Sequence, residues 1–180
     1  MSEIKHLTTA ELEHALSHLQ AAPSSEGSLE MIVRRPAEDG RERLEVGELS
    51  NDDGLVGDNW IQGRANPDCQ LTLMNSRAAD LVAAGDRTRW ELAGDQLYVD
   101  FDISDANLPA GTRVRIGAEA VVEVTAEPHM GCEKFISRFG LDAMKFVNSE
   151  TGRSLNLRGI NTKVITGGEI RVGDRLTKTA

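Results

Sequence analysis

The sequence predicts a mainly β protein with short α-helices, in which a mixed or antiparallel sheet closes into a barrel and small helices lie at its edge. Three observations support this fold class. Many short segments alternate apolar and polar residues, glycine-containing turns separate them, and the strand–helix–strand order of a parallel α/β sheet is absent. Aromatic residues make up only 4% of the chain, so aliphatic side chains must fill the core of such a barrel.

Composition limits the classes of protein to which the chain could belong. Its 180 residues suffice for one domain with a substantial core, and its net charge of −9 argues against nucleic acid as the main partner. No apolar run approaches the roughly 18 residues of a membrane span, and residues 1–6 lack the apolar core of a secretion signal. Two cysteines without CxxC spacing favour neither a zinc ribbon nor a thioredoxin motif. We therefore expect a cytoplasmic protein with reduced thiols and no membrane partner.

Residues 8–20 are expected to form the first helix. Thr8 and Glu11 have the spacing of a capping box, and apolar side chains recur on one face of the segment. His14 and His18 also share a face, but they lack a third ligand, so we interpret them as a solvated surface rather than a metal site. The apolar face of this helix is therefore expected to pack on another apolar surface.

The next segment, residues 21–28, is rich in proline, serine and glycine and should end this helix. We expect an N-terminal helical extension over residues 1–27 and a barrel domain over residues 28–180. Within the barrel domain, alternating apolar residues between turns predict strands at 29–35, 43–49, 70–74, 97–103, 112–116, 118–125, 160–166 and 169–176.

Two helices are expected between these strands. Residues 76–84 follow a strand directly, and Ser76 is the predicted N-cap. Residues 134–148 are helical in pattern but should be broken near Gly140. Residues 36–40, with proline and glycine at their ends, form the expected hairpin turn between the first two strands.

Cys132 is the first candidate functional residue. It lies between an apolar strand-like run and a predicted helix, where helix amide dipoles favour the thiolate that attacks or binds metal. The segment from Gly131 to Lys163 carries six Lys or Arg residues and three acids, although the whole chain is acidic. An anionic ligand near Cys132 is therefore plausible on charge grounds. The competing interpretation is a small buried hydrophobe, which is the more common role of an isolated cysteine.

The glycine-flanked segment from Gly152 to Gly159 is the second candidate. It contains two arginines, a serine and an asparagine, and such a turn can present backbone N–H groups and arginine forks to an oxyanion. The alternative is an ordinary polar loop.

Other nucleophile and nucleotide chemistries are less well supported. His129 lies three residues before Cys132, but no oxyanion hole or orienting third group is evident for a cysteine hydrolase. The sequence has no GxGxxG after a strand, no Walker motif and no GxSxG. Cys69, at the start of a predicted strand, is expected to be structural.

The order of several segments is specific even though each is weak alone. Together they resemble the MOSC domain family, named for the C-terminal domain of molybdenum cofactor sulfurases, over roughly residues 29–178. The matching segments are GLVGD (54–58), QLTLMN (70–75), GDQLYV (94–99), LPAGTRVRIG (108–117), VVEVT (121–125) with Pro128 and Cys132 after it, and NTKVITGGEIRVGD (161–174).

The resemblance implies a mixed β-barrel and a cysteine, here Cys132, that ligates molybdenum cofactor or carries sulfur. It implies a small-molecule substrate and, for a reductase of N-hydroxylated compounds, an electron-donor protein. Its cofactor (molybdopterin) carries a dithiolene-bound metal, which a soft thiolate can bind, and a phosphate, which suits cationic or polar side chains. The predicted cofactor contacts are Asp58, Lys134, Arg153, Ser154, Asn156 and Arg158.

Two departures from the family pattern accompany this resemblance. The residue after Gly57-Asp58 is Asn59, where a basic residue is common, and three residues separate Pro128 from Cys132.

Three functions remain open: a molybdenum-dependent oxidoreductase, a sulfur carrier with a Cys132 persulfide and a sulfur-donor partner, and a non-catalytic cofactor-binding module. A complete sulfurase is disfavoured because the chain is too short for a pyridoxal-phosphate domain.

Overall fold

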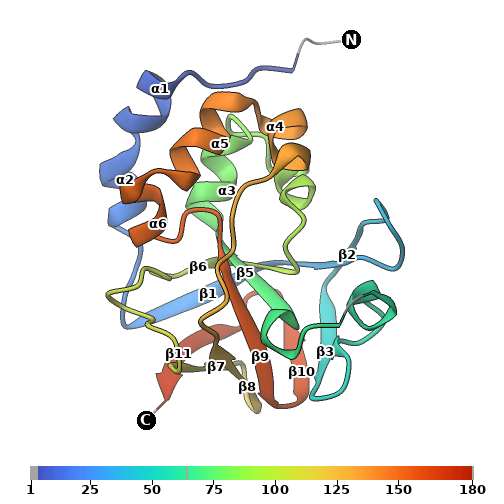
Figure 1. The fold of residues 1–180 in the computed structure, drawn as a ribbon. Helices are drawn as coiled ribbons and strands as arrows, with labels where there is room; N and C mark the ends of the chain where they lie inside the picture. Colours follow the sequence, from blue (N-terminus) through green and yellow to red (C-terminus); the bar gives the residue numbers. More distant parts are fainter. Residues whose placement is uncertain (1–3, 64, 180) are drawn as a thin grey trace.

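The computed structural model describes residues 4–63 and 65–179 (Figure 1). A β-barrel occupies one end of the molecule, and a cluster of short helices covers the other end. Seven strands close the barrel in the order β11, β7, β8, β9, β5, β6 and β1, because β11 also pairs with β1. The mixed barrel expected from the sequence is confirmed: β5 and β6 run parallel and the other pairs of the ring are antiparallel.

The barrel strands are short, and most lie close to the expected ranges. They are β1 (Glu26–Arg34), β5 (Leu71–Asn75), β6 (Leu97–Asp100), β7 (Arg113–Ile116), β8 (Ala120–Val124), β9 (Ile160–Thr166) and β11 (Arg175–Thr179). A short strand outside the ring, β2 (Glu42–Leu44), pairs antiparallel with β1. A second sheet contains β3 (Val46–Ser50), β4 (Gly54–Leu55) and β10 (Gly168–Arg171).

Two of the expected strands were wrong as single elements. The strand expected over 43–49 divides at Glu45, so that β2 pairs with β1 while β3 pairs with β10 in the second sheet. The strand expected over 169–176 divides in the same way near Gly173, whose φ of +93° turns the chain from β10 into β11. Strands that change sheet let a small barrel close at its corners, and residue alternation continues through such a bend.

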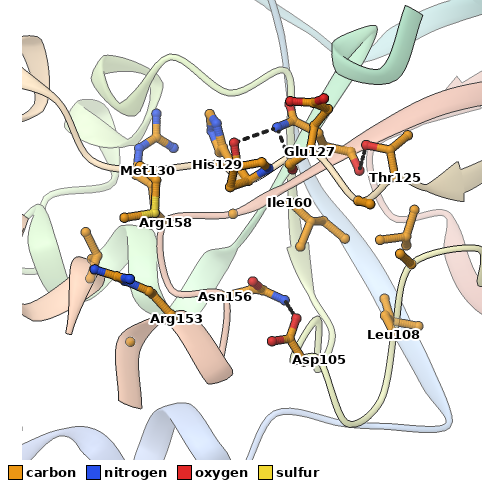
Figure 2. A pocket seen from close by; sticks show the side chains of 18 residues that line it. Asp105, Leu108, Thr125, Glu127, His129, Met130, Arg153, Asn156, Arg158 and Ile160 are labelled. Carbon is orange, nitrogen blue, oxygen red and sulfur yellow. Dashed lines mark hydrogen bonds between the residues drawn. The ribbon is translucent and has the colours of Figure 1, made fainter. Parts of the chain in front are cut away.

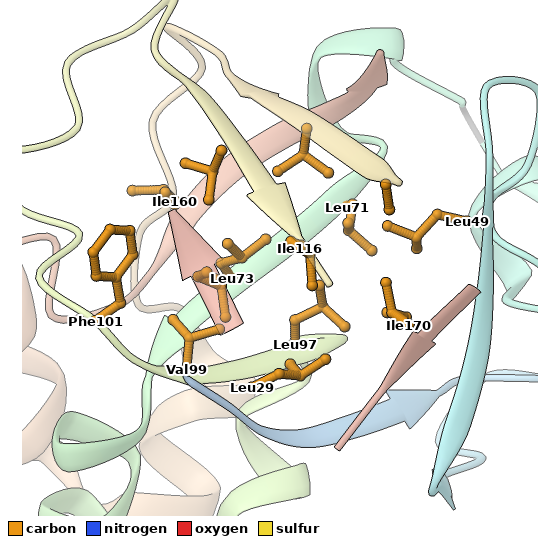
Figure 3. Close-up of a cluster of buried hydrophobic side chains, with 14 of the residues drawn as sticks. Leu29, Leu49, Leu71, Leu73, Leu97, Val99, Phe101, Ile116, Ile160 and Ile170 are labelled. Atoms are coloured by element: carbon orange, nitrogen blue, oxygen red, sulfur yellow. The ribbon is translucent and has the colours of Figure 1, made fainter. Parts of the chain in front are cut away.

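Aliphatic side chains fill the barrel, as the low aromatic content predicted (Figure 3). Leu29, Leu71, Leu97 and Ile116 are fully buried there, and Phe101 joins them at one end. Alternate residues of β7 and β8 point into this core, which follows from the two-residue period of a strand. The barrel is therefore a packed support rather than a channel.

The helices form a second core above the barrel. They are α1 (Thr9–His14), α2 (Leu16–Gln20), α3 (Ser76–Val82), α4 (Glu133–Phe139), α5 (Leu141–Asn148) and α6 (Glu150–Ser154), with 3-10 turns η1 (Asn59–Gln62), η2 (Pro67–Cys69) and η3 (Arg87–Ala93). Leu12 and Leu19 of the N-terminal extension are buried in this second core, and Thr9 N donates to Asp142 Oδ2 at 2.9 Å. None of the helices in the described ranges combines the length and apolarity that a membrane crossing requires.

Local signals at helix ends gave mixed results. The capping box of Thr8 and Glu11 is present, and the expected break at Gly140 separates α4 from α5. The predicted cap of α3 was wrong, because Asn75 rather than Ser76 accepts the hydrogen bonds from the first-turn amides. The glycine-flanked turn expected from Gly152 was wrong in its first half, because residues 150–154 form α6.

Candidate functional site

The loop that joins β8 to α4 places Cys132. It leaves the barrel after Val124 and ends at Cys132, which is the N-cap residue of α4. The thiol is exposed, forms no disulfide with Cys69, and makes no capping hydrogen bond to the helix start. The position at a strand-to-helix junction agrees with the sequence analysis, and the buried-hydrophobe interpretation of Cys132 was wrong.

A cavity of about 360 Å³ lies beside this loop (Figure 2). The loop residues 124–130 form one wall, and the segment from Gly152 to Asn161 forms the opposite wall. Arg153, Asn156 and Arg158, all predicted from the sequence, line it. We name this space cavity 1.

A buried carboxylate ties the two walls of cavity 1 together. Asp95 Oδ1 lies 2.9 Å from His129 Nε2, and Arg158 Nη1 donates to Asp95 Oδ2 at 2.7 Å. Burial alone would raise the pKa of Asp95, but the charge of Arg158 and the contact with His129 outweigh it and hold that pKa below its ordinary value. Asp95 is therefore a carboxylate across the neutral pH range.

Asp95 is not among the site residues predicted from the sequence, and His129 was considered there only as one half of an unsupported cysteine–histidine couple. Asp95 lies in one of the segments that resemble the MOSC family, and His129 lies three residues before Cys132. Those two positions were the available signals. Neither reveals the contact between them, because they are 34 residues apart in the chain.

One of the N–H groups of Arg158 has no hydrogen-bond partner among the described residues. Its Nη2 donates to Ala93 O at 2.9 Å, and its guanidinium lies 5.2 Å from the centre of the Phe135 ring. Its Nε is buried and has no hydrogen-bond partner among the described residues. A buried N–H group without a partner is costly, so this orphan beside cavity 1 marks a place where a ligand or water is expected.

The other predicted residues of this segment have different surroundings. Asn156, at a φ of +50°, donates to Ile103 O and Asp105 Oδ1, so its amide nitrogen holds the loop in shape. Ser154 Oγ donates to Thr151 O within α6 and does not line the cavity. Arg153 Nε donates to Asn148 O, and no carboxylate of the described chain pairs with its guanidinium. Arg153 is thus a cation available to a ligand.

A second cavity, of about 570 Å³, contains the remaining predicted cation, Lys134. We name it cavity 2. Arg35 and Arg41 also line it, and Trp60 contributes a buried indole N–H that lacks a partner among the described residues. Lys134 Nζ pairs with Glu38, whose side chain is 83% exposed, so this carboxylate is free to be displaced by another anion.

Asp58 lies behind cavity 2 rather than in it. Its buried carboxylate accepts from Arg35 Nε at 3.0 Å and from Arg35 Nη2 at 2.8 Å. Arg35 Nη1 in turn donates to Gly94 O at 2.9 Å, next to Asp95. Gly94 therefore contacts Arg35 of cavity 2, and the next residue, Asp95, contacts His129 and Arg158 of cavity 1.

Gly159 makes room for the His129–Asp95 pair. A Cβ atom added there would lie 2.6 Å from Leu73 O, 3.1 Å from His129 Cδ2 and 3.2 Å from Asp95 Oδ1, at a φ of +113°. We expect Gly159→Ala to lower the free energy of unfolding by at least about 1 kcal/mol. Urea denaturation would measure this, with Gly85→Ala as the control: Gly85 also has a positive φ, but nothing lies within 4 Å of the added Cβ. Equal losses in the two variants would contradict the steric explanation.

Comparisons with known proteins agree on one family and one fold. A protein-family model described as the MOSC domain matches residues 41–177. Among solved structures, the YuaD protein from Bacillus subtilis is 15% identical, with a TM-score of 0.64 over 85% of this chain and 95% of that chain. YiiM from Escherichia coli is 21% identical, with a TM-score of 0.56 over 85% of this chain and 70% of that chain.

A third structure, YiiM from Geobacillus stearothermophilus, is 14% identical, with a TM-score of 0.59 over 86% of this chain and 75% of that chain. Likeness at these identities shows a shared fold and nothing finer. No match was found among curated proteins.

Proposed function

From the premise that this chain belongs to the MOSC domain family, we propose that it binds molybdenum cofactor and reduces N-hydroxylated compounds. The observation that carries this proposal is the exposed, unpaired thiol of Cys132, which ends a loop that lines cavity 1. The metal of the cofactor prefers a soft thiolate ligand, and Cys132 is sterically open to it.

The cations that line cavities 1 and 2 fit the anionic part of such a cofactor. Lys134 at cavity 2 and Arg153 at cavity 1 both follow Cys132 in the sequence, and their charges are unpaired among the described residues or paired only with exposed acids. The orphan Nε of Arg158 offers a further buried donor beside cavity 1. Arginine and lysine are the side chains that proteins use to hold phosphate.

Each group then has a separate task. When bound, the cofactor would supply the two-electron reduction of an N–OH group. Cys132 would hold its metal, and Arg153, Arg158 and Lys134 would hold its phosphate and ring edges. Asn156 and Asp58 would act indirectly, by fixing the loop of cavity 1 and the position of Arg35. A separate donor protein would supply the electrons, since two cysteines are fewer than the four that iron–sulfur clusters usually take.

The proposal is tested by metal analysis and turnover of the purified protein. Protein made in a host that synthesises the cofactor should contain close to one molybdenum per chain and reduce an amidoxime with an artificial reductant. Protein that binds the metal without turnover would be a cofactor-binding module instead.

A sulfur carrier would give a different result in the same preparation. The exposed Cys132 thiol would gain the mass of one sulfur atom after exposure to a cysteine desulfurase, and no molybdenum would be retained. That outcome would replace the reductase proposal.

A further inference from the structure

We propose that His129 is the proton donor of this site and that the N–OH group of the substrate binds in the part of cavity 1 beside His129. The inference rests on the proposed function and extends it, by naming the substrate subsite and the residue that protonates the leaving oxygen. It is carried by the contact of His129 with buried Asp95 and by the position of His129 in the cavity wall.

Asp95 determines which ring nitrogen of His129 is free. A carboxylate only accepts hydrogen bonds, and the charge of Arg158 keeps Asp95 in that form, so His129 Nε2 must carry a proton and donate it to Asp95 Oδ1. Nδ1 is then the nitrogen left for other partners, and the structure gives it none among the described residues. A buried carboxylate that contacts an imidazole in this way fixes its tautomer and its orientation.

The surroundings of His129 suit a proton donor that meets a small molecule. Its side chain is 20% exposed, whereas that of Asp95 is fully buried, so a ligand in cavity 1 can reach the imidazole but not the carboxylate. The other charged groups that line the cavity are Asp105, Glu127, Arg153 and Arg158. A cavity of about 360 Å³ lies within the usual range for small-molecule sites, roughly 300–1,000 Å³.

The same loop sets the distance to the thiol. Cys132 is the third residue after His129, so their Cα atoms are at most about 11 Å apart. A substrate that contacts His129 in cavity 1 can therefore also approach a group held by Cys132. Met130, between them, lines the cavity and is 39% exposed, which leaves this path open to solvent.

A compound R–NH–OH takes up two electrons and two protons and gives R–NH2 and water. His129 gives a proton from Nδ1 to the hydroxyl oxygen while the N–O bond breaks, and the cofactor that Cys132 would hold would supply, from the reductant, the two electrons that nitrogen gains. The second proton comes from solvent, which also reprotonates His129.

The first experiment is nuclear magnetic resonance of the full chain labelled with 15N-histidine, titrated with benzamidoxime. The chain has four histidines, and His6, His14 and His18 are exposed internal controls. The ring nitrogens of His129 should shift, the controls should not, and benzamidine, which lacks the hydroxyl, should shift His129 less. No shift at His129, or equal shifts at all four residues, would overturn the inference whether or not the metal is bound.

The second experiment is His129→Gln in the metal-loaded protein. Glutamine keeps an N–H donor for Asp95 but cannot deliver a proton, so molybdenum content should be unchanged while turnover falls by at least about 100-fold.

The two proposals fail separately. Turnover of His129→Gln within about twofold of the wild-type rate, at normal metal content, would exclude His129 as proton donor and leave the proposed function intact. Wild-type protein without molybdenum would overturn the proposed function, and the benzamidoxime titration would still decide whether His129 contacts an N–OH group.

Discussion

Cys132→Ser is expected to abolish molybdenum retention, and with it any reduction of N-hydroxylated compounds. A serine hydroxyl is a hard, neutral ligand at neutral pH, whereas the metal of the cofactor prefers a soft thiolate. The side chain is exposed and makes no capping bond, so the substitution should leave the fold unchanged. Metal content per chain, measured by elemental analysis on protein from a cofactor-competent host, checks this directly.

Cys69→Ser is the matched control, since it removes the only other thiol. Cys69 is partly buried in η2, and Asn66 Nδ2 donates to its sulfur at 3.5 Å. Burial raises the pKa of the Cys69 thiol, and the negative charges of Glu127 and Asp68 raise it further, so little thiolate is available there. The control should keep its molybdenum. Retention of metal by Cys132→Ser, or equal loss in both variants, would exclude Cys132 as the ligand.

Arg158→Met is expected to lower the free energy of unfolding by about 3–5 kcal/mol. The substitution leaves the fully buried carboxylate of Asp95 without its cation and removes the bond to Ala93 O. A buried charge that has lost its partner is among the costliest single changes in a protein. Arg153→Met, in the same segment but exposed, should change stability by no more than about 0.5 kcal/mol. Urea denaturation of the two variants at pH 7 measures the difference.

The pH dependence of the same pair gives a further check on this result. Because the folded-state pKa of Asp95 is lowered, its contribution is fully present above the unfolded value of about 3.9 and is lost as the pH falls below it. In Arg158→Met, only His129 still opposes the effect of burial on the pKa of Asp95, so that pKa should rise. The stability deficit of the variant should then narrow as the pH falls. A deficit that stays constant between pH 7 and pH 4 would mean that lost packing, not the charge of Asp95, is responsible.

Parts of the fold followed from short stretches of sequence. The capping box of Thr8 and Glu11, the break at Gly140 and most barrel strands depend on residues within a few positions of each other. The strand expected over 43–49 failed because alternation continues through Glu45 while the hydrogen-bonding partner changes from β1 to β10. The cap of α3 failed because Asn75 and Ser76 are both good caps, and only the geometry after β5 selects the first.

The candidate site divides in the same way. Cys132 was identified from its place between a strand and a helix, and Arg153, Asn156 and Arg158 from their glycine-flanked segment. The predicted cofactor contacts do not share one cavity. Lys134 lines cavity 2, Asp58 is held behind cavity 2 by Arg35, and Ser154 lines neither cavity. A sequence displays the charge and type of each residue, but it does not display which cavity each side chain lines.

The sequence by itself determined the barrel class, the short helices, the family and the position of Cys132 between a strand and a helix. Each of these depends on local periodicity or on residue order, which a single chain displays. Only the tertiary structure brought His129 and Arg158 onto Asp95, across 34 and 63 residues of chain. The physical reason is that a buried carboxylate is stable only with its partners, and which distant residues become those partners depends on how the barrel closes.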